Sequence, residues 1–132
     1  MFMSDDTILE LQKVECDFSV CKIDNIDDID FTREFVFLQK TPDEVSLVCE
    51  SAYVPSSAIA VVTGWKALQV SGVLDFDLIG IIAKIANILA EVEISIFVVS
   101  TYDTDYFLLK AEDFDRGIQE LLRNGYVIKG EL

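Results

Sequence analysis

The sequence predicts an α+β protein of two small βαββαβ lobes, the N-terminal one shortened and mostly β. Three observations lead to this prediction. In the second half, apolar residues recur every two residues, as in a strand, and then every three to four, as in a helix. The same change of period occurs again before the chain ends. The first half alternates like strands but has only short helical segments, so it predicts the mostly β lobe.

The clearest change of period follows residues 65–71, which alternate as a strand with one buried face. Asp75 and Asp77 come next, and either carboxylate can cap the first turn of a helix. Apolar residues then fall on one wide helical stripe from Leu78 to Val92. We therefore expect a helix near residues 77–91.

The remaining second half completes the pattern. Its expected elements are a central strand at 94–100, a polar turn at 101–105, a strand at 106–110, a helix near 112–124 and a strand at 126–128. This order is the ferredoxin-like split βαβ unit, with both helices on one face of a four-stranded antiparallel sheet.

The first half is read as a second lobe with strands and at most one helical turn, at residues 26–31. Its expected strands are 18–22, 34–39, 45–49 and 58–63, with residues 7–11 as a further candidate. No Gly/Ser/Pro-rich linker separates the halves. We expect residues 1–64 to form a degenerate N-terminal lobe, residues 65–132 the C-terminal domain, and two chains to form a homodimer.

The charge of the chain excludes several partners. It carries 10 basic and 24 acidic residues, a net charge of −14, so nucleic acid and anionic membranes are poor partners. No apolar run approaches the roughly 20 residues of a membrane span. Acids stand near the N-terminus, where a secretion signal has basic residues, so a cytoplasmic location is expected.

Residues that commonly carry catalysis are scarce. The chain has no histidine, which removes the most common general base and metal ligand. Cys16, Cys21 and Cys49 have no metal-binding spacing and are expected to be buried small hydrophobic residues, with a reactive thiol as the minority alternative. No glycine-rich phosphate loop occurs. We expect no cofactor, no metal and no enzymatic activity; acid–base chemistry by aspartates alone is the least supported alternative.

Residues 74–96 read LDFDLIGIIAKIANILAEVEISI and resemble the signature of the ACT domain family. Ile79-Gly80 stands where that family typically has Pro-Gly, and Glu93 where glycine is usual. With these two differences, the segment is similar to the tandem-ACT subfamily that includes the Castor-type arginine sensors and their small bacterial relatives. Further similar blocks are TPDEVSLVC at 41–49, GWKAL at 64–68 and STYDTDY at 100–106.

The resemblance implies a regulatory or sensor module that binds a free amino acid or similar small molecule, often as a dimer, and that can act on a regulated protein target. It also implies that the loop into the first helix and the segment 100–105 form the site. The candidate ligand-binding residues are Asp75, Phe76, Asp77, Leu78, Gly80, Ile81, Ser100, Thr101, Asp103, Thr104 and Asp105.

Each candidate also has an ordinary structural explanation. Gly80 fits either close packing of helix on sheet or close approach of a ligand carboxylate to the helix N-terminus. Asp75 and Asp77 are helix caps or partners of a ligand ammonium. Asp103, Thr104 and Asp105 form the most suggestive cluster for a ligand, although two carboxylates in a hairpin loop are also ordinary turn chemistry. If the structural explanation is correct for every candidate residue, the chain is instead an ACT-fold adaptor that binds another protein and no small-molecule ligand.

Overall fold

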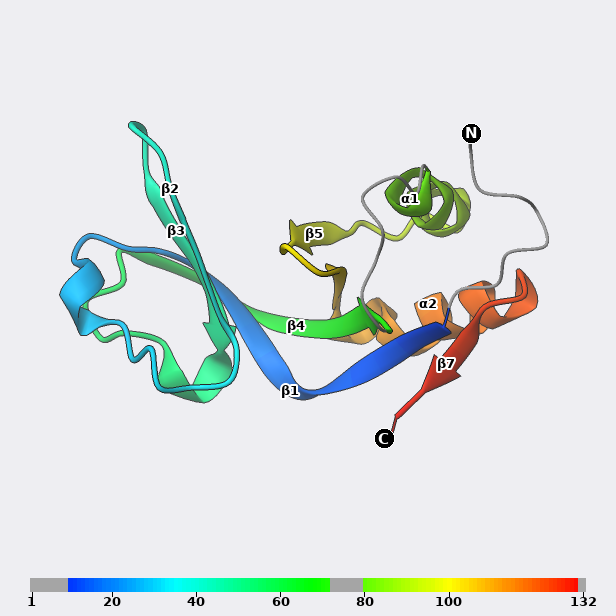
Figure 1. The fold of residues 1–132 in the computed structure, drawn as a ribbon, viewed down its shortest axis with the longest axis horizontal. Coiled ribbons are helices and arrows are strands. Elements are labelled where there is room, and N and C mark those ends of the chain that lie inside the picture. The colour runs from blue at the N-terminus through cyan, green and yellow to red at the C-terminus, as the bar shows by residue number, and fades with distance from the viewer. Residues whose placement is uncertain (1–9, 72–79, 131–132) are drawn as a thin grey trace. The chain divides into compact units, whose positions relative to one another are not determined.

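The computed structural model describes residues 10–71 and 80–130 (Figure 1). The chain divides into two compact units, which we call the helical unit (residues 1–15 and 66–132) and the β unit (residues 16–65). Two long strands, β1 (Glu10–Lys22) and β4 (Ala60–Val70), contribute residues to both units. The predicted boundary at residue 64 stays a prediction.

The helical unit has the strand and helix order that the sequence predicts. β4 is followed by α1 (Ile81–Glu91), β5 (Phe97–Ser100), β6 (Asp105–Lys110), α2 (Ala111–Arg123) and β7 (Val127–Lys129). The mixed α+β class is thereby confirmed, as are the two helices. Residues 72–79, where the first helix was expected to start, lie outside the described residues.

The expected four-stranded antiparallel sheet is wrong in one respect. The strand order of the helical unit is β7-β1-β4-β6-β5, so β1 lies between β4 and β7. β1 pairs with β7 in parallel, with Glu10 opposite Val127. The additional strand has a physical basis in Leu11, which is fully buried in the core of this unit.

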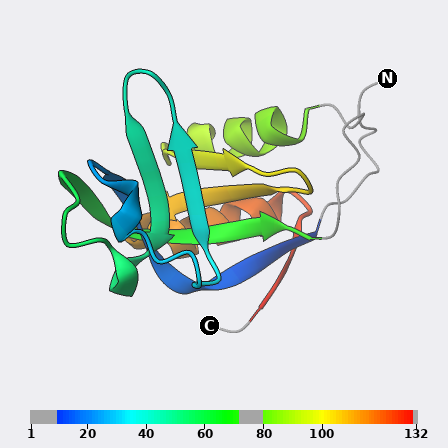
Figure 2. The ribbon, with the colours of Figure 1, turned by 60° about the vertical axis from the view of Figure 1, so that its left-hand side comes forward.

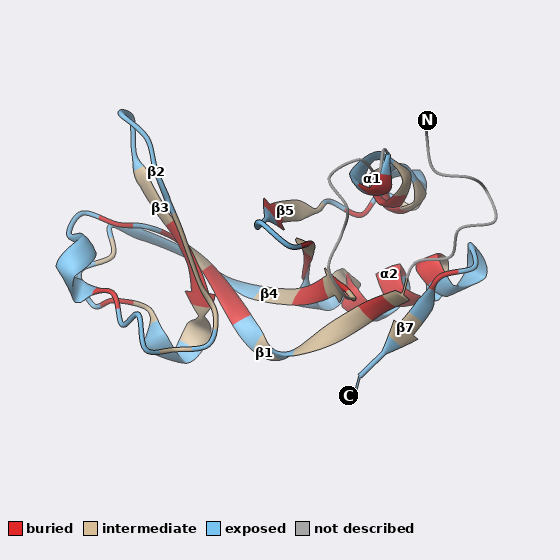
Figure 3. Ribbon diagram, viewed as in Figure 1, coloured by how far each residue is buried: buried red, intermediate tan, exposed pale blue. Residues whose placement is uncertain are grey.

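Both helices lie on the same face of this sheet (Figure 2), and the buried positions of each helix (Figure 3) belong to the core of this unit. α1 packs against α2, and α2 against β6 and β7. The core residues are Leu11, Leu68, Val70, Ile81, Ile85, Leu89, Ile94, Phe107, Leu109, Phe114, Ile118, Leu121 and Tyr126. α2 ends as predicted, with Gly125 at a φ of 92° directly after its last turn.

The β unit contains β2 (Val36–Lys40) and β3 (Val45–Glu50) next to the second half of β1, in the order β2-β3-β1. All pairs described in this unit are antiparallel. Two single 3₁₀ turns, Ile26–Asp28 and Ser51–Tyr53, stand where a complete lobe would have helices. The unit is thus mostly β, as expected.

Two long strands, β1 and β4, each include residues of two segments that the sequence predicts as separate strands. β4 runs through Gly64, whose φ is 85°, and joins the expected strands 58–63 and 65–71. β1 and β4 are neighbours, with hydrogen bonds from Ile59 N–H to Lys22 O (2.8 Å) and from Ser71 N–H to Glu10 O (2.9 Å). They therefore run antiparallel.

Across the described residues, no helix has the length and apolar character needed to cross a membrane.

Candidate functional site

Five of the predicted site residues lie at the turn between β5 and β6: three in the turn itself and two in the strand residues that flank it. Ser100 and Asp105 are the last cross-strand pair before it. Thr101 closes the turn from both sides: its N–H donates to Thr104 O (2.8 Å), and its hydroxyl oxygen accepts from Thr104 N–H (3.3 Å). The same hydroxyl donates to Thr104 O (3.1 Å). These bonds hold the backbone of the turn in a defined conformation.

Thr104 attaches this turn to β4. Its side chain is 5% exposed, and its hydroxyl donates to the carbonyl oxygen of Val70 at 2.7 Å. Val70 is the last residue of β4. The turn therefore lies beside the point where the chain leaves β4 toward the predicted ligand loop.

Gly80 forms the start of α1. It is exposed, has a φ of 85°, and its carbonyl accepts the Lys84 N–H at 2.9 Å. Among the residues that the structure describes, none would lie within 4 Å of a Cβ at Gly80, so none of them packs closely against this glycine. The left-handed backbone conformation explains it, because residues with a Cβ are strained there.

The predicted residues differ in what they present to solvent. Asp103 is exposed at the tip of the turn, next to Tyr102, which is 81% exposed; Asp105 is half-buried. The Ile81 side chain is buried in the core, so only its backbone remains for a ligand. Asp75, Phe76, Asp77 and Leu78 lie outside the described residues, and the predicted pocket against the turn stays a prediction.

The turn has no metal-binding character that the structure reveals. Within residues 10–71 and 80–130, no cluster of three or more His, Cys, Asp or Glu side chains could hold a metal ion. The chemistry that the turn offers is hydrogen bonding and the negative charge of its two carboxylates.

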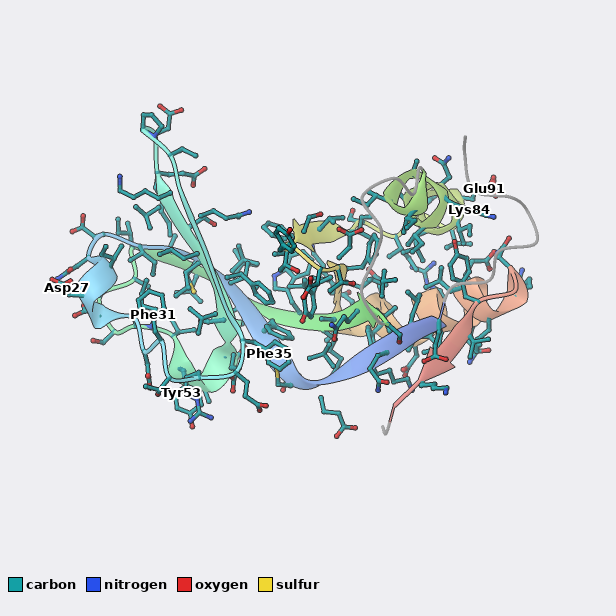
Figure 4. The ribbon with its side chains drawn as sticks, in the orientation of Figure 1. Asp27, Phe31, Phe35, Tyr53, Lys84 and Glu91 are labelled. Atoms are coloured by element: carbon teal, nitrogen blue, oxygen red, sulfur yellow. The ribbon has the colours of Figure 1, made fainter. Side chains whose placement is uncertain are left out.

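Arg33 is not among the site residues predicted from the sequence. Its guanidinium lies 3.8 Å from the ring centroid of Tyr53 and 3.7 Å from Oε1 of Glu50. The other carboxylate oxygen of Glu50, Oε2, accepts the Phe35 N–H at 3.2 Å. Phe35 and Tyr53 are labelled in Figure 4. No sequence spacing connects these residues, because the strands and turns of the β unit bring them together. The contacts join the segment before β2 to the end of β3.

Cys21 and Cys49 are buried on neighbouring strands of the β unit. Burial raises the pKa of the Cys49 thiol to about 12 and also raises the pKa of Cys21. Because the thiolate is the nucleophile, these raised pKa values disfavour the reactive form of both side chains at neutral pH.

Comparison with known proteins supports the family resemblance for part of the chain. The family model described as the ACT domain matches residues 60–123, which run from β4 to the end of α2. This range includes Gly80 and the turn at residues 101–104. No curated protein matches the sequence.

Solved structures share the fold. A protein from Agobacterium tumefaciens is 26% identical, with a TM-score of 0.82 and 96% of each chain covered. A Vibrio cholerae protein of unknown function, described as a possible transport protein, is 18% identical, with a TM-score of 0.69 and 88% and 89% coverage. The ligand-free regulatory subunit of aspartate kinase from Thermus thermophilus is 7% identical, with a TM-score of 0.61 and 87% and 96% coverage. The chain shares its fold with these proteins, and its residues 60–123 match the ACT domain.

Proposed function

We propose that this chain is a non-catalytic regulatory or sensor protein that binds a small molecule, with a free amino acid as the best candidate. The observation that carries the proposal is the ACT match over residues 60–123, which includes both the start of α1 and the turn at 101–104. A regulatory subunit of an amino-acid-metabolising enzyme has the same fold, which supports a regulatory role.

The proposed site lies between the segment Asp75–Ile81 and the turn Ser100–Asp105. Free N–H groups and the dipole of a helix N-terminus favour a carboxylate, so the ligand's α-carboxylate is placed near the start of α1. Its ammonium group then faces Asp103, Asp105 or nearby carbonyl oxygens. The bond from Thr104 to Val70 supports this arrangement, because it holds the turn beside the end of β4. Since the turn carries two acids and no base, a cationic amino acid is favoured.

A thermal-shift screen of the standard amino acids tests the proposal. A ligand at 100 times its Kd stabilises the folded state by about 2.7 kcal/mol, which raises the melting temperature measurably. We expect one or a few amino acids to do so at millimolar concentration, and their D-enantiomers to do so less. If no amino acid raises the melting temperature, the proposal fails.

The variant Asp103→Asn locates the site. Loss of a charged hydrogen bond is expected to weaken binding by about 1.5–3 kcal/mol, while the exposed position leaves folding nearly unchanged. Asp43→Asn, in the exposed turn between β2 and β3, is the control because it removes the same charge. Equal binding by both variants and the wild type would place the ligand elsewhere.

The alternative is a protein–protein adaptor with an ACT fold and no ligand. The observation that favours it is Tyr102, which is 81% exposed at the tip of the same turn, since tyrosine is enriched in protein interfaces. The adaptor predicts no ligand shift and a protein partner whose binding Tyr102→Ala weakens.

A further inference from the structure

Two loops of the β unit form a surface of exposed apolar side chains beside carboxylates. Ile26 and Phe31, which are 42% and 60% exposed, belong to the segment 23–35 between β1 and β2. Tyr53, 42% exposed, belongs to the turn after β3. These three side chains lie outside the core of the β unit, so their apolar area adds little to its stability. Figure 4 shows Phe31 and Asp27 at the same end of this unit.

Contacts between the two loops fix this surface. The Arg33 guanidinium lies 3.8 Å from the centroid of the Tyr53 ring, and the Ser57 hydroxyl donates a hydrogen bond to the Asp28 carboxylate. Ile29 is buried in the core of the unit. The loop that carries the exposed side chains is therefore held in place, and a partner does not have to order it on binding.

The carboxylates of this surface are not neutralised by the chain itself. The segment 23–35 carries five acids and one base, Arg33. Arg33 pairs with Glu50, outside the segment, at 3.7 Å. In the part of the chain that the structure describes, no lysine or arginine forms an ion pair with the aspartates of the segment, which are Asp24, Asp27, Asp28 and Asp30. These four charges are available to a cationic partner.

The charge of the surface indicates its occupant. Apolar side chains beside carboxylates are complementary to a segment that combines apolar residues with lysine or arginine. Residues 1–9 and 72–79 of this chain do not match, because each segment has two acids and no base. A second copy, with the same net charge of −14, is repelled, as are nucleic acid and anionic membranes. The remaining occupant is a basic segment of a different protein.

We propose that the surface around Phe31 is a docking site for a basic amphipathic segment of a partner protein. Phe31 and Ile26 contact the apolar side chains of the segment, and Asp24 and Asp27 pair with its lysine or arginine groups. Because exposed ion pairs are weak, the apolar contact supplies most of the affinity, whereas the carboxylates supply selectivity and fast association. This inference rests on the proposed regulatory role, and it gives the regulated target its chemistry.

Calorimetric titration of the full chain with three synthetic peptides tests the proposal. The first is an amphipathic helical peptide of leucine and lysine, the second has glutamate in place of every lysine, and the third has serine in place of every leucine. The leucine–lysine peptide should bind at least about tenfold more tightly than either of the others. Its affinity should fall as salt is added, since exposed charges are screened.

Phe31→Ser should weaken binding of the leucine–lysine peptide about tenfold, as expected for the loss of an aromatic anchor. Leu122→Ser is the matched control, because Leu122 is an apolar residue of α2 that is 44% exposed. This control should bind like the wild type. Both positions are exposed, so the melting temperatures of the two variants should stay close to that of the wild type.

A second pair of variants separates the local carboxylates from the total charge. Asp24→Asn/Asp27→Asn should weaken binding about two- to fivefold relative to Asp43→Asn/Glu44→Gln. The latter variant removes the same charge from the exposed turn between β2 and β3. Equal affinities of the two double variants would show that only the total charge attracts the peptide.

Amide chemical shifts of the isotope-labelled chain locate the bound peptide. Those of residues 24–33 and 51–57 should change, while those of α1 and α2 stay constant. The titrations contain no amino acid, so they can fail while the thermal-shift screen succeeds, and the reverse. The proposal is overturned by equal binding of the leucine–lysine peptide and either other peptide, by wild-type affinity in Phe31→Ser, by equal affinities of the two double variants, or by shifts confined to other residues.

Discussion

Two buried polar groups, the Thr104 hydroxyl and the Cys49 thiol, show how burial changes the chemistry of single side chains. The Thr104 hydroxyl satisfies the carbonyl of Val70, at a position where water has little access. Cys49 keeps its proton because a thiolate is unfavourable at a buried position. Both effects can be measured with single substitutions.

Thr104→Val should destabilise the chain by about 1–3 kcal/mol, because a side chain of the same shape leaves the Val70 carbonyl without its donor. Urea denaturation measures the free energy of unfolding. Thr101→Val is the comparison, since Thr101 is exposed and water can replace its hydroxyl. If the two variants lose equal stability, the bond to Val70 is not what anchors the turn.

Stability should fall as pH rises from about 9 to about 12, the interval between the ordinary pKa of a cysteine and the raised pKa of Cys49. In this interval the Cys49 thiol loses its proton in the unfolded chain and keeps it in the folded chain. Raising the pH therefore shifts the equilibrium toward the unfolded chain. The slope from this thiol approaches roughly 1.4 kcal/mol per pH unit. Denaturation curves of Cys49→Ala, compared with the wild type between pH 8 and about 11, isolate the effect. Parallel curves would contradict it.

At the scale of elements, the contact between α2 and β6 depends on a glycine. A Cβ at Gly117 would lie 2.5 Å from Leu109 Cδ2, and Leu89 and Ile94 are close by. Close packing is one explanation that the sequence allows for Gly80, whereas in the structure the closely packed glycine is Gly117 on the second helix. Gly117 allows close packing against Leu109, whereas Gly80 allows a left-handed backbone conformation.

Gly117→Ala should therefore destabilise the chain by about 1–2 kcal/mol, because overpacking outweighs the gain of roughly 1 kcal/mol in helix propensity. Gly80→Ala should lose about 1 kcal/mol for the different reason of backbone strain. A double-mutant cycle with Leu109→Ala separates overpacking from backbone strain. The space that Leu109→Ala opens should reduce the loss of stability caused by Gly117→Ala and leave the loss caused by Gly80→Ala unchanged.

At the scale of the whole molecule, two strands connect the units through the chain itself. β1 supplies Leu11 to the core of the helical unit and Cys21 to that of the β unit. β4 likewise begins in one unit and ends in the other. The stability of the helical unit therefore depends on a segment far away in the sequence.

A fragment of residues 65–132 is expected to be unfolded by circular dichroism, because it lacks β1 and leaves the pairing edge of β7 and the site of Leu11 empty. Adding a peptide of residues 1–22 should restore helical signal. A fragment that folds alone would show instead that the predicted boundary at residue 64 separates two autonomous domains.

The predictions from sequence succeed where a local pattern is strong. The stripe from Ile81 to Leu89 and the glycine at 125 fix α1 and the end of α2, because burial of one helix face and a left-handed C-terminal residue leave direct marks in the sequence. The turn at 101–104 is also predicted. Its anchor on Val70 is not, since no periodicity relates residues 34 positions apart.

Local patterns in the sequence are enough to predict the α+β class, the two helices, the mostly β first half and the residues proposed to bind a ligand. The folded chain is needed to show that β1 lies between β4 and β7, that Gly117 is the packing glycine and that residues 59–64 are left exposed. An alternating pattern shows that a strand has two faces, but it does not show which strands lie at its edges. Pairing partners are set by backbone hydrogen bonds, which are the same for every residue type except proline.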